Sequence, residues 1–277
     1  MRSTILGSSG FIGSHLKKYL LNSNFEIVEF KELELNKIDL IIICVGTVGN
    51  TVFYEDPLGT IESNYTFPLS ILKKLGNIHF AGKIFYVSTY FVYGECIKQK
   101  TEKDICFPIG TYALYKHQSE SLLLEYAKEY NLNLTVLRTS NIIGNREDVK
   151  SVDHNSLHII LDKIYRNESV QLIYNGNLIR NILSIDNFAK IIRSLADLDF
   201  LPKIINIGSK NELSIHKFAN TAIEIFKSSS TIILVPGSSP TYKNPKQSRI
   251  DTQLLYSLIG NIEFDDISTM LRKWIQS

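Results

Sequence analysis

Cysteine and net charge are both scarce in this sequence. Its 277 residues include three cysteines, Cys44, Cys96 and Cys106, which are widely spaced and have no metal-binding histidine pattern around them. An odd number of isolated cysteines argues against a disulfide framework and against a zinc or other metal site, and it suits a reducing cytoplasm. The 30 basic side chains nearly balance the 28 acidic ones, so we expect no basic surface for binding nucleic acid.

Long apolar runs are also missing. The longest run stops well short of the roughly 18 residues that a membrane span needs, so no membrane partner is expected. The N-terminus leads directly into a strand-like run, without the charged and apolar leader of a secreted protein. With 44% apolar and 21% charged residues, the chain has the composition of a cytoplasmic globular protein, large enough for one α/β domain or two lobes.

The first two thirds of the chain alternate short β-rich runs with segments of helix length. The run 40–45 is apolar at every position, which is typical of a parallel strand covered on both faces. Expected strands are 3–6, 26–30, 39–45, 83–87 and 133–138, and expected helices are 12–22, about 60–75 and 111–130. This alternation predicts a Rossmann-type, doubly wound parallel sheet. Only residues 31–38 join the second and third strands, so the crossover helix there is expected to be missing or reduced to a turn.

The sequence beyond residue 141 changes in character and predicts both a smaller α/β lobe and a return to the first domain. Expected helices are 156–165, 185–195, 214–226 with Ser214 as its cap, and 267–275; expected strands are 170–173 and 203–207. The segment 236–248 is rich in proline, serine and lysine and is expected to form a loop. We assign residues 1–140 to the dinucleotide-binding domain, with 182–207 returning to it, and residues 141–181 and 208–277 to a substrate lobe.

A glycine-rich segment lies between the first expected strand and the first expected helix. It reads Gly7-Ser8-Ser9-Gly10-Phe11-Ile12-Gly13. Glycines at this position allow a sharp turn and let backbone amides approach a pyrophosphate, which the helix N-terminus also attracts. The spacing differs from the Gly-x-Gly-x-x-Gly pattern, but its place between strand and helix predicts a dinucleotide site.

The residue after the second strand bears on which dinucleotide binds. A cation there suits the additional phosphate of NADP, whereas an acidic residue suits the ribose hydroxyls of NAD. Lys31 follows the strand and favours NADP, while Glu29 or Glu32 would serve NAD if the strand ended two residues away.

A tyrosine and a lysine four residues apart begin the helix expected at 111–130. Tyr112 and Lys116 share a helix face, and a neighbouring ammonium would favour the ionised form of the phenol and bring its pKa closer to neutrality. The pair Ser88-Thr89 ends the fourth strand, at the sheet edge where α/β proteins bind ligands. Thr89 could therefore hydrogen-bond the substrate oxygen that Tyr112 protonates.

Taken together, these motifs resemble the extended branch of the short-chain dehydrogenase/reductase superfamily, which comprises nucleotide-sugar epimerases, dehydratases and reductases. The resemblance extends over nearly the whole chain. It rests on the glycine segment, Asp56-Pro57 with Asn64, the segment 87–94, Tyr-x-x-x-Lys at 112–116 with Glu120, and the segments 137–144, 176–186, 206–208 and 248–251. It implies a nicotinamide cofactor, a nucleotide-sugar substrate and a homodimer built through the helices near 60–75 and 111–130.

The resemblance assigns roles to particular residues. Thr89, Tyr112 and Lys116 are the candidate catalytic residues. Candidate cofactor-binding residues are Gly7, Gly10, Phe11, Ile12, Gly13, Lys31, Val45, Asn64 and Lys116. Candidate substrate-binding residues are Tyr90, Asn141, Arg180 and Arg249, because the planar fork of an arginine suits a diphosphate.

Departures from the family pattern narrow the expected reaction. Dehydratases of this branch carry Asp-Glu after the catalytic threonine, and Tyr90-Phe91 occupies those positions here, which disfavours a 4,6-dehydratase. Asn181 also replaces the usual aspartate after Arg180. We therefore expect a 4-ketoreductase acting on a nucleotide-linked 4-keto-6-deoxy sugar, most simply with NADP. Two alternatives stay open: a 4-epimerase that retains NAD, and a cofactor-binding sensor without turnover.

Overall fold

The computed structural model describes residues 1–28, 35–47, 50–144, 155–237 and 245–276. Its centre is a six-stranded sheet in the order β2-β1-β3-β4-β5-β9, with every neighbouring pair parallel. The strands are β1 (Arg2–Leu6), β2 (Glu26–Ile27), β3 (Leu40–Ile43), β4 (Lys83–Thr89), β5 (Asn133–Thr139) and β9 (Ile204–Ile207). The predicted doubly wound parallel sheet is confirmed.

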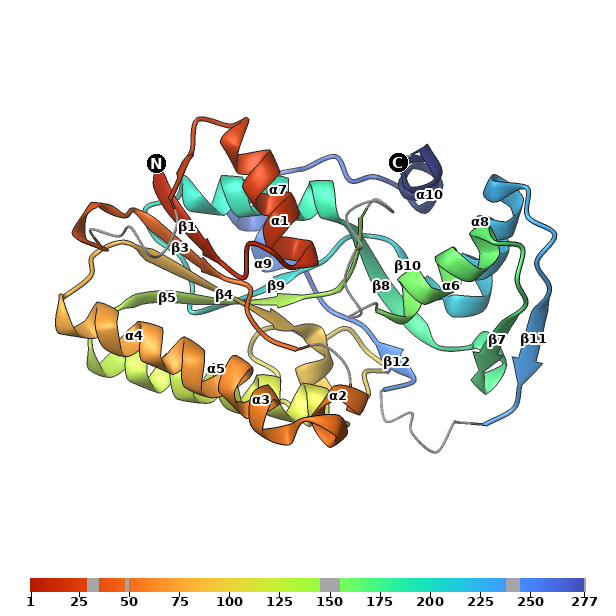
Figure 1. Cartoon of the computed structure of the whole chain (residues 1–277), viewed down its shortest axis with the longest axis horizontal. Coiled ribbons are helices and arrows are strands. Elements are labelled where there is room, and N and C mark those ends of the chain that lie inside the picture. Colours follow the sequence, from red (N-terminus) through yellow and green to blue (C-terminus); the bar gives the residue numbers. More distant parts are fainter. Residues whose placement is uncertain (29–34, 48–49, 145–154, 238–244, 277) are drawn as a thin grey trace.

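Strand β3 is buried at every residue, as expected for a parallel strand between two layers of helices. β4 pairs with β5 over seven residues, and the last pair in this register is Thr89 with Thr139. The carboxyl ends of β4 and β5 therefore lie side by side. This places the predicted catalytic threonine at the edge of the sheet where the chain crosses into the smaller lobe (Figure 1).

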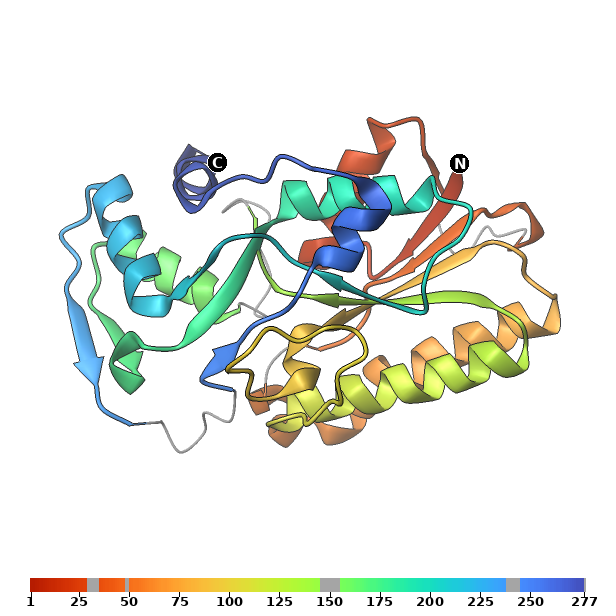
Figure 2. The same ribbon diagram turned by 180° about the vertical axis from the view of Figure 1, so that it is seen from behind.

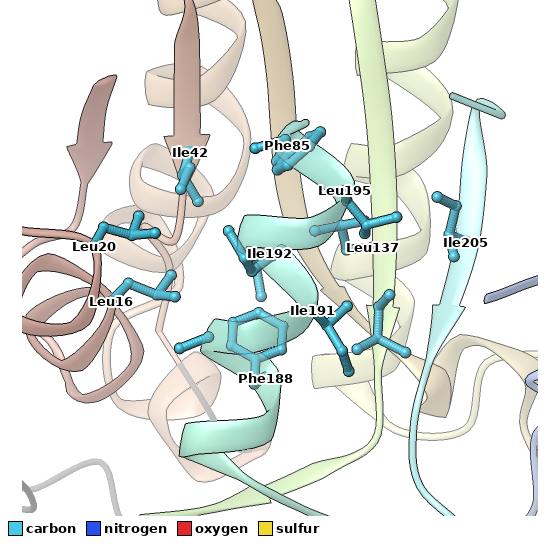
Figure 3. Packing of buried hydrophobic residues seen from close by; sticks show 14 of the residues in the cluster. Leu16, Leu20, Ile42, Phe85, Leu137, Phe188, Ile191, Ile192, Leu195 and Ile205 are labelled. Carbon is cyan, nitrogen blue, oxygen red and sulfur yellow. The ribbon is translucent and has the colours of Figure 1, made fainter. Parts of the chain in front are cut away.

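Helices cover both faces of this sheet (Figures 1 and 2). One face carries α1 (Phe11–Leu21), α7 (Ile185–Ala196) and α9 (Gln253–Ile259), and the other carries α4 (Phe67–Asn77) and α5 (Thr111–Glu129). The apolar stripe of α7 packs Phe188, Ile191, Ile192 and Leu195 against the sheet (Figure 3). No helix formed by the described residues is both long and apolar enough to cross a membrane.

The remaining elements form a smaller lobe with its own core. Its strands are β6 (Asn141–Ile143), β7 (Val170–Ile173), β8 (Ile179–Ser184), β10 (Glu212–Ser214), β11 (Ile232–Val235) and β12 (Gln247–Ser248). Its helices are α6 (Ser156–Tyr165), α8 (Ile215–Phe226) and α10 (Ile267–Gln276). Trp274 of α10 stacks on Phe226 of α8 with ring centroids 5.1 Å apart, which seats the last helix on this core.

Several elements differ from the sequence-based expectation. The expected helix near 60–75 is divided into α3 (Pro57–Ile61), a π-helical turn (Glu62–Thr66) and α4, preceded by the short α2 (Asn50–Glu55). A 3₁₀ turn at Leu35–Lys37 occupies part of the short link between β2 and β3. Segment 253–259 was assigned to the substrate lobe, but Leu255 of α9 is buried in the core beneath the sheet.

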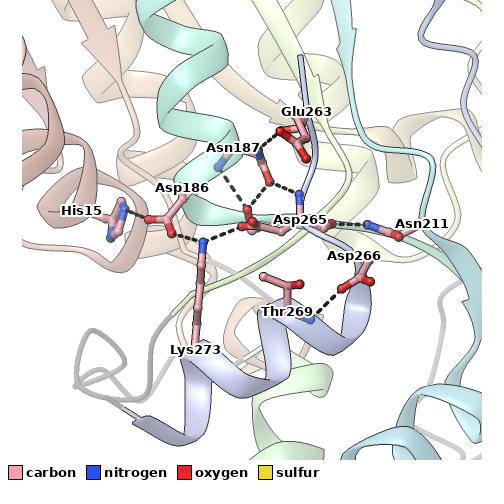
Figure 4. A network of polar contacts seen from close by, with 10 residues as sticks. His15, Asp186, Asn187, Asn211, Glu263, Asp265, Asp266, Thr269 and Lys273 are labelled. Atoms are coloured by element: carbon pink, nitrogen blue, oxygen red, sulfur yellow. Dashed lines mark hydrogen bonds and ion pairs between the residues drawn. The ribbon is translucent and has the colours of Figure 1, made fainter. Parts of the chain in front are cut away.

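A polar junction joins α1, α7 and α10 (Figure 4). Asp186 on α7 contacts His15 Nε2 at 3.0 Å and Lys273 Nζ at 3.0 Å, and Lys273 also contacts Asp265 at 2.9 Å. These contacts hold the pKa of the Asp186 carboxyl far below its usual range, the His15 hydrogen bond being the largest cause. The junction thereby connects the first helix of the sheet domain with the last helix of the lobe.

Candidate active site

The glycine-rich segment joins β1 directly to α1. Gly7 adopts a left-handed φ of +90°, and the Gly10 amide donates to its carbonyl at 3.0 Å. A Cβ at position 13 would lie 2.1 Å from the same carbonyl oxygen, so the helix can approach the turn only with glycine there. The N-terminus of α1 therefore packs directly against the glycine turn, and this arrangement suits the binding of a pyrophosphate.

A cavity of about 420 Å³ extends from this loop to the ends of β4 and β5. Eight of the predicted site residues line it, namely Gly7, Gly10, Phe11, Ile12, Gly13, Thr89, Tyr112 and Asn141. Residues from both parts of the chain surround one space, because β6 carries Asn141 out of the sheet domain and into the lobe. Its position and lining fit a dinucleotide whose pyrophosphate lies on the glycine loop.

Thr89 and Tyr112 meet inside this cavity. Thr89 is the last residue of β4, Tyr112 lies in the first turn of α5, and their side chains share a hydrogen bond. Burial raises the pKa of Tyr112 to about 12, and the Thr89 hydrogen bond opposes that rise. Tyr112 is therefore protonated at neutral pH and is placed to donate its proton.

Lys116 lies one turn further along α5 and is buried. Its Nζ donates to the Val87 carbonyl at 3.3 Å and lies 3.5 Å from the Tyr86 hydroxyl. Burial lowers the pKa of Lys116 to about 8, while Cys44 and Glu120 oppose this shift. The sequence predicted that Lys116 would lower the pKa of Tyr112 toward neutrality. In this structure burial is the largest influence on the pKa of both groups, and it raises the pKa of Tyr112 instead.

Asn64 lies in the π-helical turn that precedes α4 and is fully buried. Its Nδ2 donates to the Thr60 carbonyl at 2.9 Å, and its own carbonyl accepts from Ser119 of α5 at 2.7 Å. Its Oδ1 has no hydrogen-bond partner among the described residues. A Cβ at Gly46, which lines the cavity, would lie 2.3 Å from this oxygen and 3.2 Å from Lys116 Nζ. A buried acceptor and a buried ammonium thus meet behind the cavity wall.

The other predicted residues lie away from the cavity or outside the described residues. Tyr90 is 1% exposed and its hydroxyl accepts from Asn141 Nδ2 at 3.0 Å. Arg180 is 3% exposed and donates to backbone carbonyls, and Arg249 forms an ion pair with Glu212 at 3.0 Å. Half-buried Val45 packs on the core beneath α4 and α5, and Lys31, like Glu29 and Glu32, lies outside the described residues. Contact of either arginine with a diphosphate stays a prediction.

Further lining residues were not singled out from the sequence: Ser9, Cys44, Gly46, Phe91, Thr139, Ser140, Ile142, Asn155 and His158. Asn155 caps α6 by accepting from the amides of Leu157 and His158 at 3.0 and 3.1 Å. An asparagine directly before an apolar helical run is a recognisable cap, so this position was accessible to sequence analysis. His158 accepts from the Gly144 amide at 3.3 Å, a contact that only the fold reveals.

A buried ion pair lies beneath the candidate catalytic groups. Glu120 of α5 accepts from Nε and Nη2 of Arg138 on β5 at 3.1 and 2.8 Å, and it accepts a short hydrogen bond from Ser88 on β4. Its carboxylate thus ties together the helix that carries Tyr112 and the two strands that end at the cavity.

Comparisons with known proteins agree with this fold. Residues 29–208 match the NAD dependent epimerase/dehydratase family. A curated relative, the "Putative UDP-glucose 4-epimerase" of Methanocaldococcus jannaschii, is 23% identical over 77% of this chain and 78% of its own length.

Two solved structures share the fold. UDP-glucuronic acid 4-epimerase from Bacillus cereus, in complex with UDP-glucuronic acid and NAD, has a TM-score of 0.86 and 20% identity over 100% of this chain and 98% of its own. RMD from Pseudomonas aeruginosa, complexed with NADPH, has a TM-score of 0.83 and 20% identity over 99% and 97%. The family match covers more than half of the sequence, and the chain therefore belongs to the NAD dependent epimerase/dehydratase family.

Proposed function

We propose that this protein is an NADP-dependent reductase that converts the C4 keto group of a nucleotide-linked 4-keto-6-deoxyhexose to an alcohol. The observation that carries the proposal is the hydrogen-bonded pair Thr89 and Tyr112, which shares one cavity with the glycine loop. This pairing supports our assignment of Tyr112 as the proton donor and of Thr89 as a hydrogen-bond donor to one carbonyl oxygen beside the proposed dinucleotide site.

The residues of this chain supply the proton that the reduction requires. When bound, a reduced nicotinamide supplies the hydride to the carbonyl carbon. Tyr112 gives its hydroxyl proton to the oxygen as the C–O double bond becomes single, and it recovers a proton from solvent. Thr89 orients that oxygen, and its hydroxyl stabilises the phenolate that Tyr112 leaves behind. This direction of reaction needs a protonated Tyr112, which the raised pKa provides at neutral pH while making the phenol a weaker acid.

Lys116 and Asn64 complete the cofactor side of the proposed site. Desolvation lowers the pKa of Lys116 to about 8, so most molecules carry its charge at pH 7. We assign to this ammonium the electrostatic stabilisation of the phenolate and a hydrogen bond to the nicotinamide ribose. The unpartnered Oδ1 of Asn64 is a buried acceptor on the same side of Gly46.

The cofactor itself is proposed to be NADP. Lys31 follows the strand expected at 26–30, where a cation suits the additional phosphate of NADP, although β2 itself ends at Ile27. NAD is the alternative, with Glu29 or Glu32 on the ribose hydroxyls. The neighbouring structures include one with NAD and one with NADPH, so both cofactors occur on this fold.

A 4-epimerase is the second candidate function. The names of the M. jannaschii relative and the B. cereus structure favour it, since both include the term 4-epimerase. An epimerase oxidises and re-reduces the same carbon, so it keeps its NAD between turnovers, whereas a reductase exchanges its cofactor in every cycle.

The state of the cofactor in the purified protein distinguishes the two. The protein is denatured, and any released nucleotide is identified by chromatography and mass. An empty protein that binds NADPH more tightly than NADH supports the reductase. Stoichiometric NAD or NADH in the released fraction supports the epimerase and overturns our first choice.

The role of Tyr112 is tested by Tyr112→Phe with Tyr126→Phe as the matched control. Both changes remove a hydroxyl from α5, but Tyr126 lies outside the cavity. Turnover is followed as loss of NADPH absorbance on a nucleotide-linked 4-keto-6-deoxyglucose. We expect Tyr112→Phe to lower turnover by about 100-fold or more and Tyr126→Phe to leave it intact. Wild-type turnover in Tyr112→Phe would refute the proton-donor role.

A further inference from the structure

We infer that Phe91 is a specificity-determining residue. It selects a sugar whose substituent on C5, the carbon next to the reacting C4, is small and uncharged, such as the methyl group of a 6-deoxyhexose. The inference rests on the proposed function, because it concerns the substrate of that same cavity. The chemical class selected against is the hexuronate, in which the corresponding substituent is a carboxylate.

Phe91 lies next to the reacting groups. It follows Thr89 by two residues, in the 3₁₀ turn Tyr90–Tyr93, and it lines the cavity together with Thr89 and Tyr112. Its amide donates to Thr89 Oγ1 at 3.3 Å. The Thr89 hydroxyl, which contacts Tyr112, thus also accepts from the backbone of Phe91. This shared contact holds the Phe91 ring and the Tyr112 hydroxyl in a fixed relative position.

The ring of Phe91 is held by its neighbours. Tyr90 stacks on it with centroids 4.8 Å apart and planes inclined by 25°. The Arg180 guanidinium lies over it, 5.4 Å from the centroid. Asn141 holds the Tyr90 hydroxyl at 3.0 Å, so the stacking partner is fixed as well.

Arg180 is committed to this clamp and to the backbone. Its Nη1 donates to the carbonyls of Ile179 and Lys246 at 2.7 and 3.1 Å, and its Nη2 donates to that of Pro245 at 2.7 Å. The arginine is 3% exposed. It therefore serves as a support for the Phe91 ring, and its charge is turned toward backbone oxygens.

The described residues that line the cavity include no aspartate, glutamate, lysine or arginine, and His158 is the one titratable basic side chain among them. A substrate carboxylate placed against Phe91 would lose its water, and the nearby Arg180 guanidinium already donates to three backbone carbonyls, so this desolvation is costly. A methyl group at the same place would gain apolar contact with the ring. The same wall offers no second acid or base for water elimination, because a phenyl ring transfers no proton.

The inference is tested by direct binding, independently of turnover. Wild-type protein saturated with the oxidised dinucleotide that it binds more tightly is titrated calorimetrically with three sugars, 6-deoxyglucose, glucose and glucuronic acid, each carried by UDP, dTDP and GDP. We expect the 6-deoxy sugar on the preferred nucleotide to bind about tenfold or more tightly than the uronate, with glucose between them. Equal or tighter binding of the uronate overturns the inference and leaves the reductase proposal standing. If no nucleotide sugar binds, the proposed function fails and the inference fails with it.

Two variants then locate the selectivity. Phe91→Ser removes the wall, and we expect the ratio of the two affinities to fall to within about threefold, whereas Phe91→Leu keeps an apolar wall and retains most of the ratio. Unchanged binding of the dinucleotide to both variants shows that the fold is intact. A ratio that is unchanged in a folded Phe91→Ser protein refutes the assignment to Phe91. If Phe91→Ser does not fold, Phe91→Gln, which keeps much of the side-chain volume but is polar, replaces it with the same expectation.

Discussion

Replacing Glu120 by alanine should destabilise the protein strongly, although the residue is buried and does not line the cavity. Glu120 is 1% exposed and accepts two hydrogen bonds from Arg138, which is 4% exposed, and one from Ser88. The Arg138 guanidinium also lies over the Tyr93 ring, 4.8 Å from its centroid. Without Glu120 this cation stays buried and charged, and breaking such a pair costs about 3–5 kcal/mol. The higher helix propensity of alanine offsets only a few tenths of a kcal/mol.

Glu125→Ala is the matched control for this prediction. It makes the same change on the same helix, but Glu125 is exposed and pairs with Lys128 at 3.5 Å, so its loss should cost about 0.5 kcal/mol or less. The free energy of unfolding is measured by urea titration for wild type and both variants. A Glu120→Ala cost within about 1 kcal/mol of the Glu125→Ala cost would refute the reasoning. Adding Arg138→Met to Glu120→Ala should recover a substantial part of the loss, because it removes the unpaired charge.

Three further predictions concern the cofactor loop, Lys116 and the polar junction. Gly13→Ala should abolish dinucleotide binding, measured by fluorescence titration with NADPH, because its Cβ would lie 2.1 Å from the Gly7 carbonyl oxygen; unchanged affinity would contradict the close approach. The pKa of Lys116 is lowered from 10.5 to about 8 in the folded protein, so above pH 8 the unfolded state binds more protons than the folded state. The free energy of unfolding of wild type, relative to that of Lys116→Met, should therefore rise by about 1 kcal/mol between pH 8 and 9. A difference between the two proteins that does not change with pH would contradict the lowered pKa. Asp186→Asn should destabilise the protein at pH 7, because it removes the carboxylate that Lys273 contacts. The pKa of Asp186 is depressed in the folded state, so in urea titrations this difference should shrink as the pH falls below about 4; a constant difference would refute the ionic origin.

The features that the sequence determined are local ones. The glycine segment between a strand and a helix predicted the loop at Gly7–Gly13, and the apolar run predicted a fully buried β3, because both patterns depend only on neighbours along the chain. The spacing of Tyr112 and Lys116 predicted that they share a helix, and Ser214 was recognised as the cap of α8. The order of strands and helices was enough to predict the parallel sheet, since few topologies suit such an alternation.

The strands of the smaller lobe were largely missed for a physical reason. β8 (Ile179–Ser184) is almost entirely buried although it contains an arginine and an asparagine, Arg180 and Asn181. Its polar groups are satisfied by partners distant in sequence, such as the carbonyl of Pro245 for Arg180 and that of Ser209 for Asn181. Because these partners are distant along the chain, the polar pair interrupts the apolar pattern by which a buried strand is recognised.

Which side chains meet in the cavity was decided by the tertiary structure alone. The sequence placed Thr89 and Tyr112 at the ends of two elements, but their hydrogen bond exists because β4 and α5 are joined through Ser88 and Glu120, 32 residues apart. Likewise the pKa of Tyr112 depends on burial, which outweighs the neighbouring lysine that the spacing suggested. Spacing determines which face of an element a residue occupies, whereas desolvation and partners depend on what packs against that face, and only the folded chain supplies them.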